Sequence, residues 1–259
     1  MKEKIYRSLV ELTNGKTSSK VLKTVTASKL SKSLIRSYSK VYDINTDEVS
    51  NSVDSFTNLQ QFFTRTLKEG TRPVDEASNV YVSPVDAKIE TFGVITDNCS
   101  LTVKNKLYSV ADLLGSEQRA NTYKNGTYIV FYLSPADYHR IHSPIDAHVV
   151  NQYVLGQKSY PVNQWGLNYG KKPISHNYRL VTELAVDSQQ TAFIKVGAMF
   201  VNSIELTNKT MQWHKGKEVG YFSFGSTVVM LFQEDAITFT ENVVEGQMVR
   251  MGERFAIML

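Results

Sequence analysis

Ten short segments rich in aromatic and β-branched residues follow one another between residues 80 and 232, and they constrain the fold more than any other feature. Such segments favour β-strands, and turn signals such as Asn125-Gly126 and Lys215-Gly216 separate several of them. The expected strands are 80–82, 88–95, 101–103, 128–133, 148–155, 178–184, 193–196, 200–206, 221–224 and 228–232. One short helix is expected among them, over 109–114. Many short strands with few helices predict a barrel- or sandwich-like β core rather than a doubly wound α/β sheet.

Helical periodicity characterises the chain before this series of strands. Apolar residues recur at helical spacing over 4–13 and 19–42, and a third helix is expected over 59–64, capped by Ser55 or Thr57. An extended connector begins near Arg72 and Pro73. The chain is therefore predicted to be α+β and mainly β, with a helical region over 1–75 and a β-rich domain over 76–259.

The positive charge of the chain is concentrated at its amino terminus. Residues 1–40 hold ten Lys or Arg and two Glu, a net charge of +8, whereas the whole chain carries +4. A basic arm of this kind favours an anionic partner, either a membrane surface or a nucleic acid. Its amphipathic helices either lie in a bilayer interface or pack on the protein body with a solvated basic face.

Two absences narrow the expected location of the protein. No run of about 18 apolar residues is present, so neither a membrane span nor a signal peptide is expected. The single cysteine, Cys99, excludes an internal disulfide and is typical of a reducing compartment.

Reactive side chains occur first at Asp86, after a strand and a proline turn, and then around two histidines. His139 and His142 lie three residues apart, close to Asp137, and follow an apolar strand. Histidine suits proton exchange near neutral pH, although a turn aspartate and structural histidines are the simpler interpretations. Zinc binding by the two histidines lacks a third ligand at a helpful spacing, so no metal is expected.

A third reactive stretch is Gly225-Ser226-Thr227, which lies between two strand-like runs. Glycine within a strand pattern often marks a bulge and opens unusual backbone conformations, so the Gly225 carbonyl can turn toward the Ser226 hydroxyl. This arrangement favours attack by Ser226 on the preceding peptide bond or on a bound substrate, and a simple β-bulge is the alternative. Asp86, a histidine and Ser226 are the parts of a nucleophile, base and orienter system, but the sequence does not show that they meet.

Taken together, these motifs resemble the pyruvoyl-dependent phosphatidylserine decarboxylase family. The matching strings are S-P-V-D-A at 83–87, Y-L-S-P-A-D-Y-H-R-I-H-S-P at 132–144, P-V-N at 161–163, V-G-A at 196–198, N-S-I-E at 202–205 and G-Y-F-S-F-G-S-T-V at 220–228, with F-F-T-R at 62–65 and R-P-V-D at 72–75 upstream. Two departures are Phe224, where leucine is common, and Ala87, where glycine is common. The first is a hydrophobic exchange that leaves the chemistry intact, and the second tightens a turn.

The resemblance implies a zymogen that cuts its own backbone between Gly225 and Ser226. The products would be a large chain, 1–225, and a small chain, 226–259, which stay together as a heterodimer, with a higher oligomer left open. Ser226 would become a covalent pyruvoyl group, so that the cofactor is pyruvate made from the chain. That group would bind phosphatidylserine as a Schiff base and release phosphatidylethanolamine.

The resemblance also implies a role for each candidate residue. Asp86 and His142 would orient and deprotonate Ser226 during the self-cleavage. His139 would donate a proton to the product carbon, with Asp137 orienting this histidine.

A phospholipid-synthesising lyase of this family must reach a bilayer. The basic helices are therefore expected to dock on the anionic surface at the cytoplasmic face of the cell membrane, as a peripheral protein. Nucleic acid is not expected, since no basic stretch carries interleaved stacking aromatics. Three alternatives are a serine hydrolase using Ser226, His142 and Asp86, a non-catalytic membrane-docking β module, and a pyruvoyl decarboxylase acting on a free amino acid or a modified phospholipid. The hydrolase would leave the chain uncut, and no G-x-S-x-G motif favours it.

Overall fold

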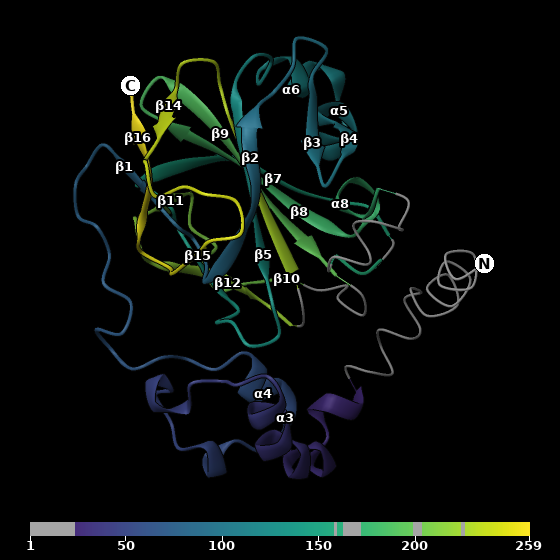
Figure 1. The fold of residues 1–259 in the computed structure, drawn as a ribbon, viewed down its shortest axis with the longest axis vertical. Helices are drawn as coiled ribbons and strands as arrows, with labels where there is room; N and C mark the ends of the chain where they lie inside the picture. The colour runs from purple at the N-terminus through teal and green to yellow at the C-terminus, as the bar shows by residue number, and fades with distance from the viewer. Residues whose placement is uncertain (1–23, 158–159, 163–171, 199–203, 224–225) are drawn as a thin grey trace.

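An eight-stranded antiparallel sheet forms the centre of the computed structural model, which describes residues 24–157, 160–162, 172–198, 204–223 and 226–259 (Figure 1). The strand order is β11-β7-β8-β9-β13-β5-β2-β15. In that order the strands are Gln212–Trp213, Ala147–Leu155, Arg179–Val186, Gln189–Gly197, Ser226–Phe232, Thr127–Leu133, Ala87–Val94 and Met248–Val249. The sheet is open, and its edges are the two-residue strands β11 and β15.

Two three-stranded sheets cover one face of this main sheet. Their strands are β1 (Val80–Val82), β16 (Arg254–Met258) and β14 (Ile237–Phe239) in one, and β10 (Ile204–Leu206), β12 (Glu218–Phe222) and β6 (Arg140–His142) in the other. Alternate residues such as Phe131, Phe193 and Met230 pack from the main sheet against Phe222 and Phe255 of the covering sheets. The expected α+β, mainly β protein with a sandwich-like core is therefore confirmed.

The other face of the main sheet is covered by a hairpin and three short helices. These elements are β3 (Ser100–Val103), β4 (Lys106–Ser109), α5 (Val110–Leu114), α6 (Glu117–Asn121) and α8 (Pro173–His176). Helix α5 begins after its N-cap Ser109 and ends at Gly115, whose left-handed φ of 70° suits glycine. The prediction of a single helix here was wrong, because α6 and α8 are too short to show helical periodicity.

A separate helical region precedes the β body and lies beneath it in Figure 1, in purple and blue. It contains the 3-10 helices η1 (Lys29–Leu34), η2 (Thr46–Glu48) and η3 (Val53–Ser55) and the α-helices α3 (Ile35–Val41) and α4 (Leu59–Phe63). Ile35, Phe56, Leu59 and Phe62 form its own small core. No helix among the described residues is long and apolar enough to cross a membrane.

Details of this region differ from the sequence-based expectation. The N-cap of α4 is Asn58, whose side chain accepts a hydrogen bond from the Gln61 amide, and neither Ser55 nor Thr57 has this role. The stretch over 19–42 ends as a 3-10 helix followed by a short α-helix, and its apolar residues do not share one buried face, since Ile35 is buried while Leu30 is 86% exposed. The helix expected over 4–13 lies outside the described residues.

Candidate active site

Ser226 is the first residue of the central strand β13, between β5 and β9. Its register partners are Leu133 on β5 and Gly197 on β9. Strand alternation directs its side chain toward the same face as Val228, which belongs to the sandwich core. The hydroxyl is fully buried and has no hydrogen-bond partner among the described residues. An unsatisfied buried polar group costs about 1–3 kcal/mol, so this hydroxyl needs an explanation, and a reacting group provides one.

Asp86 lies at the same end of the main sheet as Ser226. It immediately precedes β2, which pairs with β5 so that Lys88 lies opposite Tyr132. Strands β13 and β2 therefore flank β5, and their backbones lie two strand spacings apart, roughly 10 Å. Strand β5 lies between them, and its Leu133 is the register partner of Ser226.

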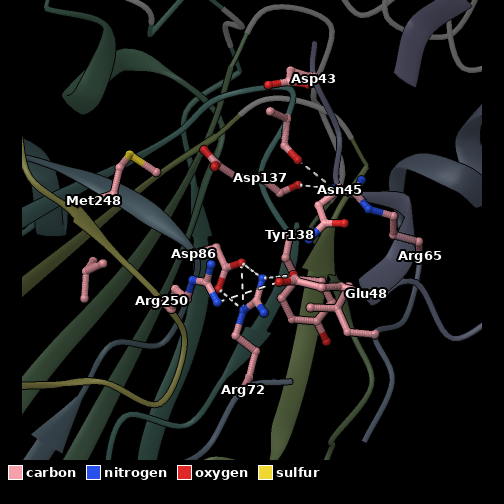
Figure 2. A pocket seen from close by; sticks show the side chains of 13 residues that line it. Asp43, Asn45, Glu48, Arg65, Arg72, Asp86, Asp137, Tyr138, Met248 and Arg250 are labelled. Carbon is pink, nitrogen blue, oxygen red and sulfur yellow. Dashed lines mark hydrogen bonds and ion pairs between the residues drawn. The ribbon is translucent and has the colours of Figure 1, made fainter. Parts of the chain in front are cut away.

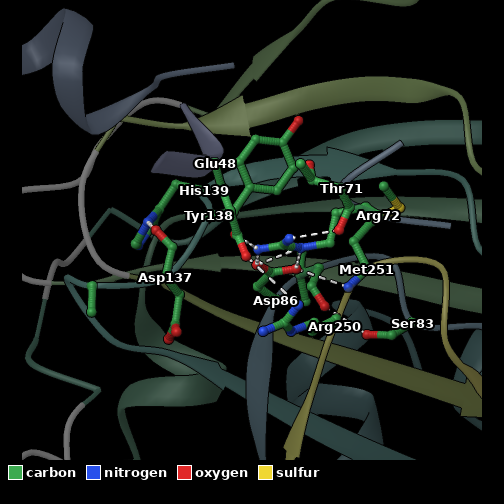
Figure 3. A network of polar contacts seen from close by, with 12 residues as sticks. Glu48, Thr71, Arg72, Ser83, Asp86, Asp137, Tyr138, His139, Arg250 and Met251 are labelled. Atoms are coloured by element: carbon green, nitrogen blue, oxygen red, sulfur yellow. Dashed lines mark hydrogen bonds and ion pairs between the residues drawn. The ribbon is translucent and has the colours of Figure 1, made fainter. Parts of the chain in front are cut away.

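A buried ion pair fixes the Asp86 carboxylate (Figure 3). Arg72 donates to it from Nε at 2.9 Å and from Nη2 at 2.6 Å, and the Met251 amide donates at 2.8 Å. The same Arg72 pairs with Glu48 of η2 at 2.8 Å, and its side chain is only 9% exposed. This ion pair therefore also ties the helical region to the end of β2.

His142 ends β6 in the covering sheet, and its side chain is buried. Its Nδ1 lies 2.9 Å from the Gly216 carbonyl oxygen, and its Nε2 lies 3.1 Å from the Tyr138 hydroxyl. Because a carbonyl only accepts, Nδ1 carries the proton and Nε2 is the basic nitrogen. Burial lowers the pKa of His142, although the Gly216 bond and the nearby Glu218 and Asp86 carboxylates oppose this shift. The imidazole is thus neutral near pH 7 and able to accept a proton.

His139 is completely buried at the end of the loop that precedes β6. Its Nδ1 lies 2.8 Å from the Asp137 carbonyl oxygen, and the Phe63 ring packs against it with centroids 4.0 Å apart. Burial lowers the pKa of His139 to about 3, with the Arg65 charge adding to the effect. Its Nε2 has no partner among the described residues, so His139 presents a neutral, basic nitrogen.

Asp137 lies with Asp86 in a cavity of about 290 Å³ between the helical region and the β body (Figure 2). Tyr138, Arg65 and Arg72 also line this cavity. The Asp137 carboxylate accepts the Ser134 amide at 2.6 Å, and burial raises its pKa. Asp137 therefore contacts His139 through its backbone carbonyl and not through its side chain.

The structure brings most of the expected site residues to one end of the sandwich. Asp86 and Asp137 share the cavity, His142 contacts the cavity residue Tyr138, and His139 contacts the Asp137 backbone. No hydrogen bond joins Asp86, His142 and Ser226 to one another across the described residues. Gly225 lies outside them. The described residues also contain no group of three or more His, Cys, Asp or Glu arranged to hold a metal ion.

Four residues of this site were not identified as functional from the sequence. They are Arg72, Tyr138, Arg65 and Phe63, which hold Asp86, His142 and the His139 loop. A signal for all four did exist, because the F-F-T-R and R-P-V-D strings contain Phe63, Arg65 and Arg72, and the string over 132–144 contains Tyr138. The strings alone do not reveal which side chains they touch.

Comparisons with known proteins identify the family of the chain. A family model described as phosphatidylserine decarboxylase matches residues 59–257. The phosphatidylserine decarboxylase proenzyme of Geobacillus sp. (strain WCH70) is 52% identical over 254 residues, which are 98% of this chain and 98% of that protein. The proenzyme of Anoxybacillus flavithermus (strain DSM 21510 / WK1) is also 52% identical, over 98% of this chain and 96% of its own. The proenzyme of Bacillus cereus (strain B4264) is 48% identical over 100% of this chain and 99% of its own.

Proposed function

Because the chain belongs to the phosphatidylserine decarboxylase family, we propose that it decarboxylates phosphatidylserine to phosphatidylethanolamine with a pyruvoyl group made from its own Ser226. The observation that carries this proposal is the fully buried, unpartnered Ser226 hydroxyl at the start of β13. Two buried histidines with lowered pKa values lie at the same end of the sandwich. Neutral imidazoles of this kind accept protons, which both the cleavage and the decarboxylation require.

In the self-cleavage, the Ser226 Oγ attacks the carbonyl carbon of Gly225. An ester replaces the peptide bond, and elimination then releases the Gly225 carboxylate and leaves dehydroalanine at position 226. Uptake of one water and loss of ammonia convert this residue into the pyruvoyl group. His142 Nε2 accepts the hydroxyl proton in the first step, exchanging Tyr138 for Ser226 as its partner. The Asp86 carboxylate balances the charge that His142 gains.

The residues around position 226 fit such a group. Leu133 and Gly197 enclose this position on both sides, and the serine side chain faces the sandwich core away from bulk water. When present, a pyruvoyl group supplies a ketone that binds a primary amine and accepts the electron pair left when carbon dioxide departs. Gly197, the register partner of Ser226 on β9, places no side chain beside the reacting atoms.

His139 handles the substrate protons in this proposal. The amine of the serine headgroup arrives as an ammonium ion and must lose a proton before it attacks a ketone. His139 Nε2, neutral and unpartnered, accepts that proton and later returns it to the carbon from which carbon dioxide has left. The lowered pKa favours the return of the proton. A positioned acid–base group of this kind contributes about 10²- to 10⁴-fold in rate.

The small chain would remain in the protein after cleavage. All seven residues of β13 are buried, and this strand pairs with β5 on one side and β9 on the other. The two products therefore stay associated as a heterodimer, because release of 226–259 would open the centre of the main sheet.

The helical region docks the enzyme peripherally on an anionic membrane at the cytoplasmic face. Three apolar side chains project from it into solvent, with Leu30 86%, Val25 52% and Leu34 50% exposed. Lys29 and Lys32 lie beside them and are exposed as well. Each lysine near an anionic surface contributes about 1 kcal/mol to binding, in addition to burial of the apolar side chains.

Two matched substitutions test the proposed chemistry. Ser226→Ala should stay full length and inactive, whereas Thr227→Ala should still cut, because it removes a buried hydroxyl that faces the opposite side of the sheet. A Ser226→Ala protein that remained one uncut chain and still decarboxylated at the full rate would refute the proposal.

The two histidines are separated by a second pair of substitutions. His142→Ala should impair cutting, whereas His139→Ala should cut but decarboxylate slowly. If both variants cut and decarboxylated at the rate of the unchanged protein, the roles proposed for these histidines would be wrong.

A further inference from the structure

The end of helix α4 and the two residues after it, 63–65, contact the loop that carries His139, residues 134–139, and the start of β6. From the contacts of this segment we infer that Arg65 and Phe63 are positioning residues for His139, so that the helical region completes the decarboxylation site as well as docking the protein. This inference rests on the proposed role of His139. It assigns a second role to a part of the chain that is otherwise expected only to bind membranes.

Side chains and backbone of the helical region contact most residues between 135 and 140. The Tyr38 hydroxyl donates to the Pro135 carbonyl at 3.2 Å. Arg65 Nη2 donates to the Ala136 carbonyl at 2.6 Å and to the Asp137 carbonyl at 3.1 Å. The Phe63 ring lies against His139, and the Thr64 carbonyl accepts a hydrogen bond from Arg140 Nε at 3.0 Å. The loop conformation is therefore set from the helical side.

The Asp137 carbonyl is the point through which Arg65 reaches His139. This single oxygen lies 3.1 Å from Arg65 Nη2 and 2.8 Å from His139 Nδ1. Since the carbonyl accepts from both groups, it fixes the proton of His139 on Nδ1 and leaves Nε2 free for substrate. A hydrogen bond to one ring nitrogen of a histidine sets both the tautomer and the orientation of the ring.

Arg65 is an expensive residue to bury for structural reasons alone. It is 4% exposed, makes no ion pair among the described residues, and leaves Nε and Nη1 without hydrogen-bond partners. Its hydrogen-bond acceptors among the described residues are two carbonyl oxygens of the His139 loop, and its guanidinium lies 5.5 Å from the Phe62 ring centroid. The Asp86 and Asp137 carboxylates favour this charge without forming an ion pair with it, so its direct partners are the two loop carbonyl oxygens, which indicates a role in the loop that it holds.

Substitutions of Arg65 separate this role from substrate binding. Arg65→Met removes both hydrogen bonds that Nη2 donates to the loop. We expect kcat to fall by about 10²-fold while KM changes less than about threefold, because displacement of a reacting group by about 1 Å has this effect. Arg65→Lys keeps a charge and a donor and should recover part of kcat. Phe63→Leu keeps an apolar side chain but removes the ring contact, and kcat should fall in the same way. The matched control is Arg119→Met, which changes an arginine of α6, outside the helical region, that is 40% exposed and should leave both constants unchanged.

A spectroscopic measurement tests the inference without turnover. In Ser226→Ala protein labelled with ¹⁵N-histidine, His139 should show the Nδ1-protonated tautomer, with its signal assigned by His139→Gln. Adding Arg65→Met should convert this signal into a mixture of the two tautomers. Self-cleavage of Arg65→Met in the unchanged Ser226 background reports that the variant has folded.

The outcomes discriminate clearly. Unchanged kcat in Arg65→Met and Phe63→Leu, or an unchanged His139 tautomer, would overturn the inference, and a rise in KM alone would make Arg65 a substrate contact instead. If Arg65→Met fails to fold, Phe63→Leu alone decides by the same two readouts. Failure of the proposed function is a different result, since the unchanged protein would then not cut itself.

Discussion

The buried ion pair between Arg72 and Asp86 gives the most quantitative prediction. Arg72 and Asp86 side chains are 9% and 8% exposed, and Arg72 also pairs with Glu48, which is 20% exposed. Arg72→Met would leave the Asp86 carboxylate without its arginine, whereas Glu48 would keep Arg250 at 3.7 Å. Breaking a buried pair by removing one partner costs about 3–5 kcal/mol. For a chain of this size that corresponds to a fall in Tm of about 6–20 °C.

The assay is thermal and urea unfolding in the uncut Ser226→Ala background, so that cleavage does not alter the comparison. Arg36→Met is the control, because Arg36 and Asp54 form an exposed pair at 2.8 Å that should contribute less than about 1 kcal/mol. Adding Asp86→Asn to Arg72→Met should restore part of the stability, since the unpaired charge is removed. A loss below about 1 kcal/mol in Arg72→Met would refute the claim that this pair holds Asp86.

Two further predictions concern acid stability and membrane docking. Burial lowers the pKa of His139 from 6.5 to about 3, so the stability that its neutral form provides is complete above pH 6.5 and is lost as the pH falls toward 3. The free energy of unfolding of Ser226→Ala should therefore fall between pH 7 and pH 5, and this fall should be smaller by about 2 kcal/mol when His139→Gln is added. An equal fall in both proteins would contradict the assignment. Leu30→Glu combined with Leu34→Glu should weaken binding to phosphatidylserine vesicles at least about tenfold, because two exposed apolar side chains no longer enter the bilayer. The exposed Val94→Glu on β2 serves as the control, and equal binding by all three proteins would exclude docking through this surface.

The strands that the sequence predicts well are those with long apolar or alternating runs. The central strand β13 has seven buried residues, and its core from Val228 to Phe232 was expected from its aromatic and β-branched content. The last strand, β16, was not predicted, because its residues show no clear alternation and its partner lies far away in sequence. Val80 pairs with Ile257 there, and no local pattern encodes such a contact.

The site shows the same division between local and distant information. The reactive residue types of Asp86, His139, His142 and Ser226 are readable from the chain, since each follows or begins an apolar strand. Their partners are not, because Arg65 lies more than seventy positions before the Asp137 carbonyl that it holds. The contact arises only when the helical region folds against the β body.

The most direct test of the central claim is the intact mass of the freshly purified protein under denaturing conditions. We expect two chains, residues 1–225 and 226–259, with the smaller one beginning in a ketone that hydroxylamine traps. A fully active enzyme that consists of one uncut chain and does not react with hydroxylamine would contradict this claim.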